Sequence, residues 1–182
     1  MASDAAAHFA AFMLALGHDP ASDPHLAGTP DRVAAMYAEL LNGRDFAFTT
    51  FPAEGDQLIA VVGIPFTSFC AHHFLPFTGV AHIGYIPRDR IAGLSKLARA
   101  VHHLAARPQV QERLTEQVAD LLAERLDPLG LAVVLHARHG CMELRGARAV
   151  GAVTLTSAVR GVLMDDAAAR AEFYGLIGNA GS

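Results

Sequence analysis

Two β-rich runs, QLIAVVGIPF (57–66) and GVAHIGYI (79–86), decide the fold that the sequence predicts. Both are dominated by β-branched, aromatic and other apolar residues, and Pro87 directly after the second run ends it. The segment between them, TSFCAHHFLPF, is expected to form a loop or an irregular strand. These runs therefore predict the first strand pair of a sheet, with several unusual residues gathered at the connection.

Outward from this pair, the pattern continues with two helices and two more strands. Residues 94–105 carry apolar residues at helical spacing, and Pro108 is expected to begin a second helix. Residues 131–137 and 151–159 are predicted strands. The order ββααββ predicts an α+β fold, a four-stranded antiparallel sheet with helices on one face. Because a small sheet has two free edges, association of several copies is expected.

Further helices are expected at both ends of the chain. They are residues 4–17, a helix that Thr29 caps and that runs to about Leu41, and a last helix from Asp165 or Asp166 to about Ile177. We predict a division into an N-terminal helical segment, 1–50, and a main domain, 51–182, that contains the predicted sheet.

Composition narrows the class of protein. The chain has 182 residues, 52 % of them hydrophobic and 18 % charged, which is typical of a globular protein. The net charge of −4 offers no global basic field for nucleic acid or an anionic membrane surface, so an anionic substrate needs a local basic cluster. No apolar run is long enough to span a bilayer, and the N-terminus lacks the early Lys or Arg of a signal peptide. A cytoplasmic location is expected.

A metal site is the first chemical candidate. Cys70, His72 and His73 lie within one short segment, and Cys141 could supply a further ligand. Three nitrogen or sulfur ligands that leave one position open are typical of a catalytic zinc. The alternative is two buried structural cysteines beside two polar histidines. In an extended segment the two histidines would point in opposite directions, so one would bind metal while its neighbour faces the substrate.

A phosphate-binding site is the second candidate. In GLSKLAR (93–99), Ser95, Lys96 and Arg99 share one face of a helix near its N-terminus. The free N–H groups and the positive end of the helix dipole favour an anion there. The alternative is an ordinary solvated basic face.

Polar residues beside the other helix and the second cysteine complete the candidates. Glu112 could accept hydrogen bonds from N1–H and the 2-amino group of a guanine, with Gln111 beside it; ordinary surface polarity is the alternative. His139 precedes Cys141 by two residues and suits acid–base catalysis. Arg145 could hold phosphate.

Together these segments resemble the GTP cyclohydrolase I family over residues 26–178. The motifs that carry the resemblance are GTPDRVAAMY (28–37), SFCAHHFLPFTG (68–79), HIGYIP (82–87), GLSKLAR (93–99), RPQVQERLTEQVAD (107–120), HGCMELRG (139–146) and TSAVRGV (156–162). So many short motifs in one order make the resemblance specific.

The resemblance implies a tunnelling fold whose subunits join into rings, two pentameric rings forming a homodecamer, with active sites between subunits. It also implies a role for each candidate residue. By role these are zinc ligands Cys70, His73 and Cys141; proton-transfer histidines His72 and His139; Ser95, which also assists at the ribose; guanine contacts Gln111 and Glu112; and triphosphate contacts Ser95, Lys96, Arg99, Arg145 and, from a neighbouring subunit, Arg32.

The implied reaction is the zinc-dependent hydrolytic opening of the imidazole ring of GTP at C8. It releases formate and, after rearrangement of the ribose, gives 7,8-dihydroneopterin triphosphate. Protonation of the purine N7 by a nearby imidazole would make C8 a better electrophile.

The chain departs from the family pattern near the site. The family usually reads Cys-Glu-His-His, but this chain has Ala71 in the second place, and it has Ala35 where Lys is common and His136 where an acidic residue is common. Two alternatives follow: a diverged paralogue that acts on another guanine nucleotide or stops at an opened-ring product, and a non-catalytic, zinc-stabilised assembly module.

Overall fold

The computed structural model describes residues 2–179, which form two compact units that divide between Asn42 and Gly43. The functional boundary predicted at residue 50 stays a prediction. Within the described residues, no helix has both the length and the apolar character needed to cross a membrane.

The first unit is a pair of packed helices, α1 (Ala2–Ala15) and α2 (Thr29–Leu40). The prediction that Thr29 caps α2 is wrong by one residue, because Gly28 occupies the cap position and no side chain caps the helix. The Thr29 hydroxyl instead accepts a hydrogen bond from Arg32 Nη2 at 3.0 Å.

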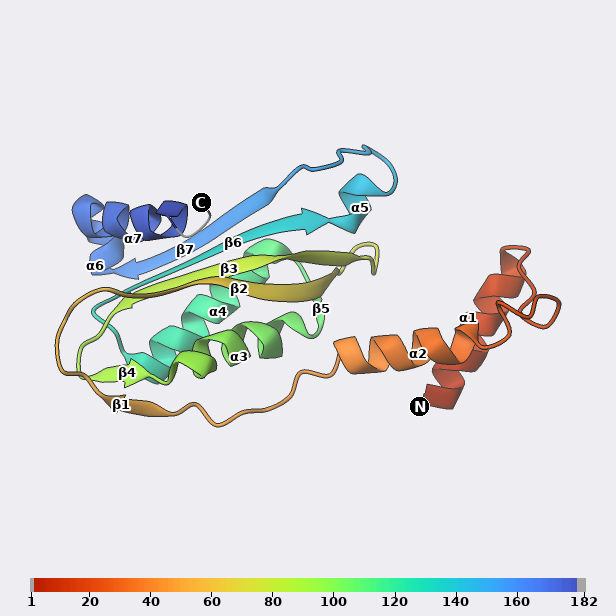
Figure 1. Cartoon of the computed structure of the whole chain (residues 1–182), viewed down its shortest axis with the longest axis horizontal. Coiled ribbons are helices and arrows are strands. Elements are labelled where there is room, and N and C mark those ends of the chain that lie inside the picture. Colours follow the sequence, from red (N-terminus) through yellow and green to blue (C-terminus); the bar gives the residue numbers. More distant parts are fainter. Residues whose placement is uncertain (1, 180–182) are drawn as a thin grey trace. The chain divides into compact units, whose positions relative to one another are not determined.

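The second unit contains a five-stranded sheet in the order β5-β2-β3-β6-β7 (Figure 1). Its strands are β2 (Ile59–Cys70), β3 (Pro76–Ile86), β5 (Pro108–Gln109), β6 (Gly130–His139) and β7 (Thr154–Gly161). The four long strands pair antiparallel, which confirms the α+β class and the four predicted strands. A separate two-stranded ribbon joins β1 (Thr50–Pro52) to β4 (Arg90–Ala92).

The fifth strand corrects the expected four-stranded sheet. Pro108 does not begin a helix, because Pro108 and Gln109 pair in parallel with Phe69 and Cys70. The buried side chain of Gln109 anchors this segment, with Nε2 donating to the Leu104 carbonyl at 2.9 Å. The helix therefore begins only after β5.

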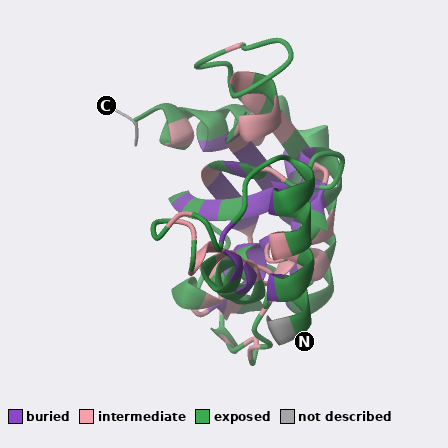
Figure 2. Cartoon of the chain, turned by 90° about the vertical axis from the view of Figure 1, so that its right-hand side faces the viewer, coloured by how far each residue is buried: buried purple, intermediate pink, exposed green. Residues whose placement is uncertain are grey.

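One face of the sheet is covered by α3 (Leu94–Ala105) and α4 (Gln111–Leu126). The start and end predicted for the first of these helices are confirmed. In Figure 2 the buried residues gather on the strands of the sheet. The main core consists largely of fully buried side chains from both layers, among them Ile83, Tyr85, Leu97, Val101, Leu114, Val118, Leu122, Leu131, Val133 and Leu135.

The opposite face is also partly covered, so the expectation of helices on one face is wrong. Two C-terminal helices, α6 (Val162–Asp165) and α7 (Ala167–Asn179), supply Leu163 and Phe173 to a second buried cluster with Ala132 and Val134 of β6. Because strand side chains alternate, these β6 residues face away from α3 and α4. Asp166 caps α7 by accepting backbone N–H bonds from the first turn, as predicted.

Candidate active site

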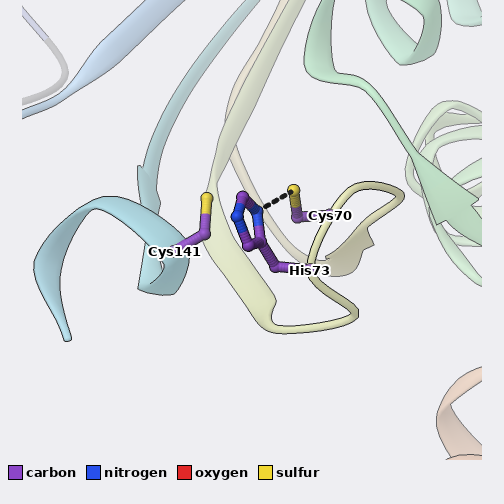
Figure 3. Close-up of side chains that lie close together, drawn as sticks. All are labelled: Cys70, His73 and Cys141. Carbon is purple, nitrogen blue, oxygen red and sulfur yellow. Dashed lines mark hydrogen bonds between the residues drawn. The ribbon is translucent and has the colours of Figure 1, made fainter. Parts of the chain in front are cut away.

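Three side chains that could together bind a metal ion meet where β2 ends. Cys70 is the last residue of β2, His73 lies in the turn that follows, and Cys141 lies in the short helix α5 (Gly140–Glu143). Their ligand atoms all lie within 4.8 Å of one another. Figure 3 shows the His73 ring between the two sulfur atoms. The structure thus gathers the three side chains that the family resemblance assigned to zinc.

Local backbone geometry creates this meeting point. The chain reverses after Cys70, whose N–H donates to the Leu75 carbonyl at 2.8 Å, while Phe74 N–H donates back to the Cys70 carbonyl at 2.8 Å. Phe74 has a positive φ of 56°, which closes the turn. Gly140 allows α5 to lie close against the start of β3, because a Cβ at this position would lie 2.9 Å from the Pro76 carbonyl oxygen.

The donor set fits zinc. Two sulfur atoms and one imidazole nitrogen are ligands that zinc prefers, and three protein ligands leave a position open for substrate or water. Burial, and then the neighbouring Cys70, raise the pKa of the Cys141 thiol. A divalent cation would reverse this effect, since it favours the thiolate form.

The two neighbouring histidines do not point in opposite directions, as an extended segment would require. Residues 71–73 form a turn, and both rings approach the same sulfur, with Cys70 Sγ 3.8 Å from Nδ1 of His72 and 3.9 Å from Nδ1 of His73. Only His73 also lies close enough to Cys141 to complete the three-ligand group.

His139 is held between an aromatic ring and an amide. Its imidazole stacks on Phe77, with ring centroids 4.5 Å apart, and its Nε2 lies 2.7 Å from Gln111 Oε1. Burial lowers the pKa of His139, and the carboxylate of Glu112 opposes that shift. The ring is therefore oriented by protein groups beside the metal-binding side chains.

One cavity of about 200 Å³ is lined by half of the predicted site residues. The predicted residues among those that line it are Cys70, His72, Gln111, Glu112, His139 and Cys141. Arg145 lies at the same end of the sheet, with Nη1 3.2 Å from Nε2 of His73. This arrangement can bind a metal, move protons and hold a polar base at one place.

The predicted phosphate-binding residues lie away from this cavity. Ser95, Lys96 and Arg99 are in the first two turns of α3, directly after Ala92, whose N–H donates to the Tyr85 hydroxyl at 2.9 Å. Tyr85 is eight residues along β3 from Phe77, or about 26 Å at the usual rise per residue. Figure 1 shows the start of α3 beside β4, at the end of the sheet away from α5. Arg32 belongs to the first unit.

Sequence reasoning missed three residues that support His139: Phe77, Thr115 and Thr156. Phe77 is an apolar strand residue in the sequence, yet its ring stacks on the imidazole of His139. Thr115 lies one helical turn after Gln111, and this spacing was the available signal.

The fold and the cavity together define a small α+β protein with a candidate metal site beside titratable side chains. The archaeosine synthase QueF-Like, solved in the apo form, shares this fold with a TM-score of 0.50 and 15 % identity over 59 % of this chain and 97 % of that chain. This similarity concerns the fold alone and supports the tunnelling fold.

Sequence comparison gives the family. The sequence profile of GTP cyclohydrolase I matches residues 5–178. GTP cyclohydrolase 1 of Halalkalibacterium halodurans is 51 % identical over 90 % of this chain and 89 % of its own length, and that of Bacillus subtilis is 51 % identical over 87 % and 86 %. The protein of the same name from Mycobacterium bovis is 50 % identical over 91 % and 85 %. The chain belongs to the GTP cyclohydrolase I family and is a hydrolase of that type.

Proposed function

We propose that this chain is a zinc-dependent GTP cyclohydrolase I that opens the imidazole ring of GTP at C8, releases formate and forms 7,8-dihydroneopterin triphosphate. Its membership of the family is the main support. The single structural observation that carries the proposal is the convergence of Cys70, His73 and Cys141 beside a cavity that also contains His139 and Glu112.

The proposed roles follow from chemistry and position. Cys70, His73 and Cys141 hold zinc, which when bound acts as a Lewis acid and makes water nucleophilic at neutral pH. His139 and His72 transfer protons, and protonation of the purine N7 makes C8 a better electrophile. Glu112, at the start of α4, accepts hydrogen bonds from the guanine edge. Arg145 pairs with phosphate oxygens.

The remaining roles require more than one copy of the chain. Ser95, Lys96 and Arg99 are separated from the metal-binding side chains by most of the length of the sheet, so one nucleotide cannot reach both groups within one subunit. We therefore propose a homo-oligomer, a decamer of two pentamers, in which neighbours supply these residues and Arg32. The cytoplasmic location and the absence of nucleic-acid and membrane partners remain predictions from the sequence.

The first test measures product formation. Zinc-loaded protein is incubated with GTP, and formate release and the fluorescence of the oxidised pterin are followed. The proposal expects both signals, and expects both to vanish in Cys141→Ala, which removes one ligand. Formate without pterin would identify an enzyme that stops at the opened ring. If zinc-loaded protein gives neither formate nor pterin, that result would contradict the proposal. Equal kcat/KM values for GTP, GDP and GMP would favour the diverged paralogue.

The second test addresses the shared site. Cys141→Ala lacks a metal ligand and Lys96→Ala lacks a phosphate contact, so each homo-oligomer is expected to be inactive or nearly so. Co-expression of the two variants would form mixed rings in which some sites take both intact halves from different subunits. Partial recovery of formate release is expected. No recovery in mixed oligomers of confirmed composition would contradict a site built between subunits.

A further inference from the structure

The side chain of Gln111 is fully occupied by protein partners. It is 2 % exposed. Its Nε2 lies 3.0 Å from the Thr154 carbonyl oxygen, 3.2 Å from that of Leu135 and 3.1 Å from Thr156 Oγ1. Its Oε1 lies 2.7 Å from Nε2 of His139. A side chain bonded in this way has little left with which to read a base.

The neighbours of Gln111 fix which way its amide points. The backbone carbonyls of Leu135 and Thr154 can only accept hydrogen bonds, so the NH₂ group must face them. The opposite orientation would place the amide oxygen against two carbonyl oxygens, neither of which can donate to it, which is costly. Oε1 of Gln111 therefore faces His139.

Two threonines close a cycle of hydrogen bonds around this amide. Thr115 Oγ1 donates to the backbone carbonyl of Gln111 at 2.9 Å and lies 2.7 Å from Thr156 Oγ1. Since the Thr115 proton goes to that carbonyl, Thr156 donates to Thr115 and accepts from Gln111 Nε2. The cycle begins and ends at Gln111, so the first turn of α4 and strand β7 together hold its side chain.

This arrangement determines the tautomer of His139. Because Oε1 of Gln111 only accepts, the Nε2 of His139 must carry a proton, and the free lone pair of the neutral ring lies on Nδ1. The stack on Phe77, with planes 6° apart, fixes the plane of the ring, and the bond to Gln111 fixes its rotation within that plane.

We propose that Gln111 is a positioning residue that holds His139 with Nε2 protonated, so that Nδ1 is the nitrogen that exchanges a proton with the substrate. When His139 acts as the acid, its ring starts protonated on both nitrogens: the Nδ1 proton goes to the purine N7, and the neutral ring that remains keeps its Nε2–H bond to Gln111. Base selection then falls to Glu112 rather than to Gln111. The inference rests on the proposed proton-transfer role of His139.

The test is Gln111→Met, which keeps the approximate length of the side chain and removes its hydrogen bonds. We expect kcat for formate release to fall about 10- to 100-fold, because a misoriented acid–base group costs rate rather than binding. KM for GTP should change less than about threefold, and the preference for GTP over inosine triphosphate, which lacks the 2-amino group, should be kept. Gln57→Met, the same change at an exposed glutamine of the second unit, should match the wild type.

Two comparisons make the result decisive. Glu112→Gln should lower the preference for GTP over inosine triphosphate. If Gln111→Met instead loses that preference, or raises KM at unchanged kcat, Gln111 reads the base and the inference is overturned.

If Gln111→Met does not fold, Thr156→Val is the second variant, because it breaks the same cycle one bond away. It should lower kcat by a smaller factor with KM kept, and an unchanged kcat in that variant overturns the inference. A wild-type protein that releases no formate would instead overturn the proposed function.

Discussion

The imidazole of His139 lies flat on the ring of Phe77, with centroids 4.5 Å apart and planes 6° from parallel. Phe77 is 1 % exposed and meets Phe66 edge-on, with centroids 6.0 Å apart. The surface on which His139 rests is therefore part of the hydrophobic core. Through this contact, core packing sets the orientation of the proposed acid–base residue.

Phe77→Leu keeps an apolar side chain in the core but removes the flat ring. Since an aromatic stack contributes about 0.5–1.5 kcal/mol beyond burial, we expect kcat to fall about 2- to 12-fold. Steady-state formate release measures this effect. Phe66→Leu is the matched control, because it makes the same change one ring further from His139 and should lower stability with little effect on kcat. Equal losses of kcat in both variants would contradict a specific role for the stack.

Removal of the metal should abolish activity without unfolding the chain. The three ligands lie at the end of β2, in the following turn and in α5, whereas most of the core lies between the sheet and α3 and α4. We expect chelation to stop formate release, to leave the far-UV circular dichroism nearly unchanged and to lower the melting temperature, since a ligand of the native state stabilises it. Added zinc should restore activity. Full turnover after verified metal removal would contradict the prediction.

Periodic patterns predicted most of the regular structure. Residues 94–105 form α3 with the expected bounds, because one face of that segment is consistently apolar. Pro108 misled the prediction, since a proline suits the first turn of a helix but also suits the extended segment that pairs with Phe69 and Cys70. Local sequence favoured the helix, and tertiary pairing decided otherwise.

The sequence of β6 contains a signal that the sheet is covered on both faces. In LAVVLHA, Ala132 and Val134 are as apolar as Leu131 and Val133, and a strand without alternation is typical of one buried on both faces. The structure accounts for it by placing α7 over these residues.

The metal-binding group could be predicted because its residue types are rare and chemically specific. The spacing of Cys70, the two histidines and Cys141 left structural cysteines as an alternative, the family resemblance selected His73, and the structure brings Cys70, His73 and Cys141 together. The bond between Gln111 and His139 could not be predicted, because it depends on side-chain rotamers and on the position of β7 beside α4. Sequence patterns specify faces of elements, but not the network of polar atoms between them.

The docking of α7 can be tested at one glycine. Gly84 of β3 faces Phe173, which is fully buried, and an added Cβ would overlap the phenyl ring. We expect Gly84→Ala to displace α7 and to lower the free energy of unfolding by about 1–3 kcal/mol, as overpacking does. Gly175→Ala is the control within α7, where an added Cβ has open space and a better helix former should be neutral or stabilising. Urea unfolding compares the two variants.

The stability of the fold should depend on pH through His82. Its Nδ1 accepts the Gly63 N–H at 3.2 Å, and its Nε2 is the buried side-chain polar atom that has no hydrogen-bond partner within the described part of the chain. The ring of His136 lies 5.0 Å away, centroid to centroid. Burial first, and His136 second, lower the pKa of His82 below the ordinary histidine value.

The direction of the effect follows from linkage. In the unfolded chain His82 takes up a proton near pH 6.5, while in the folded chain it stays neutral to lower pH, so stability is lost as the pH falls below about 6.5. One such proton contributes a slope of at most about 1.4 kcal/mol per pH unit. In His82→Asn, whose side-chain oxygen can still accept the Gly63 N–H, this part of the slope should disappear. Urea unfolding between pH 5 and about 7 measures it. His8→Asn, at an exposed position of α1, should leave the slope unchanged. An identical slope in His82→Asn and the wild type would show that the buried imidazole does not titrate with folding.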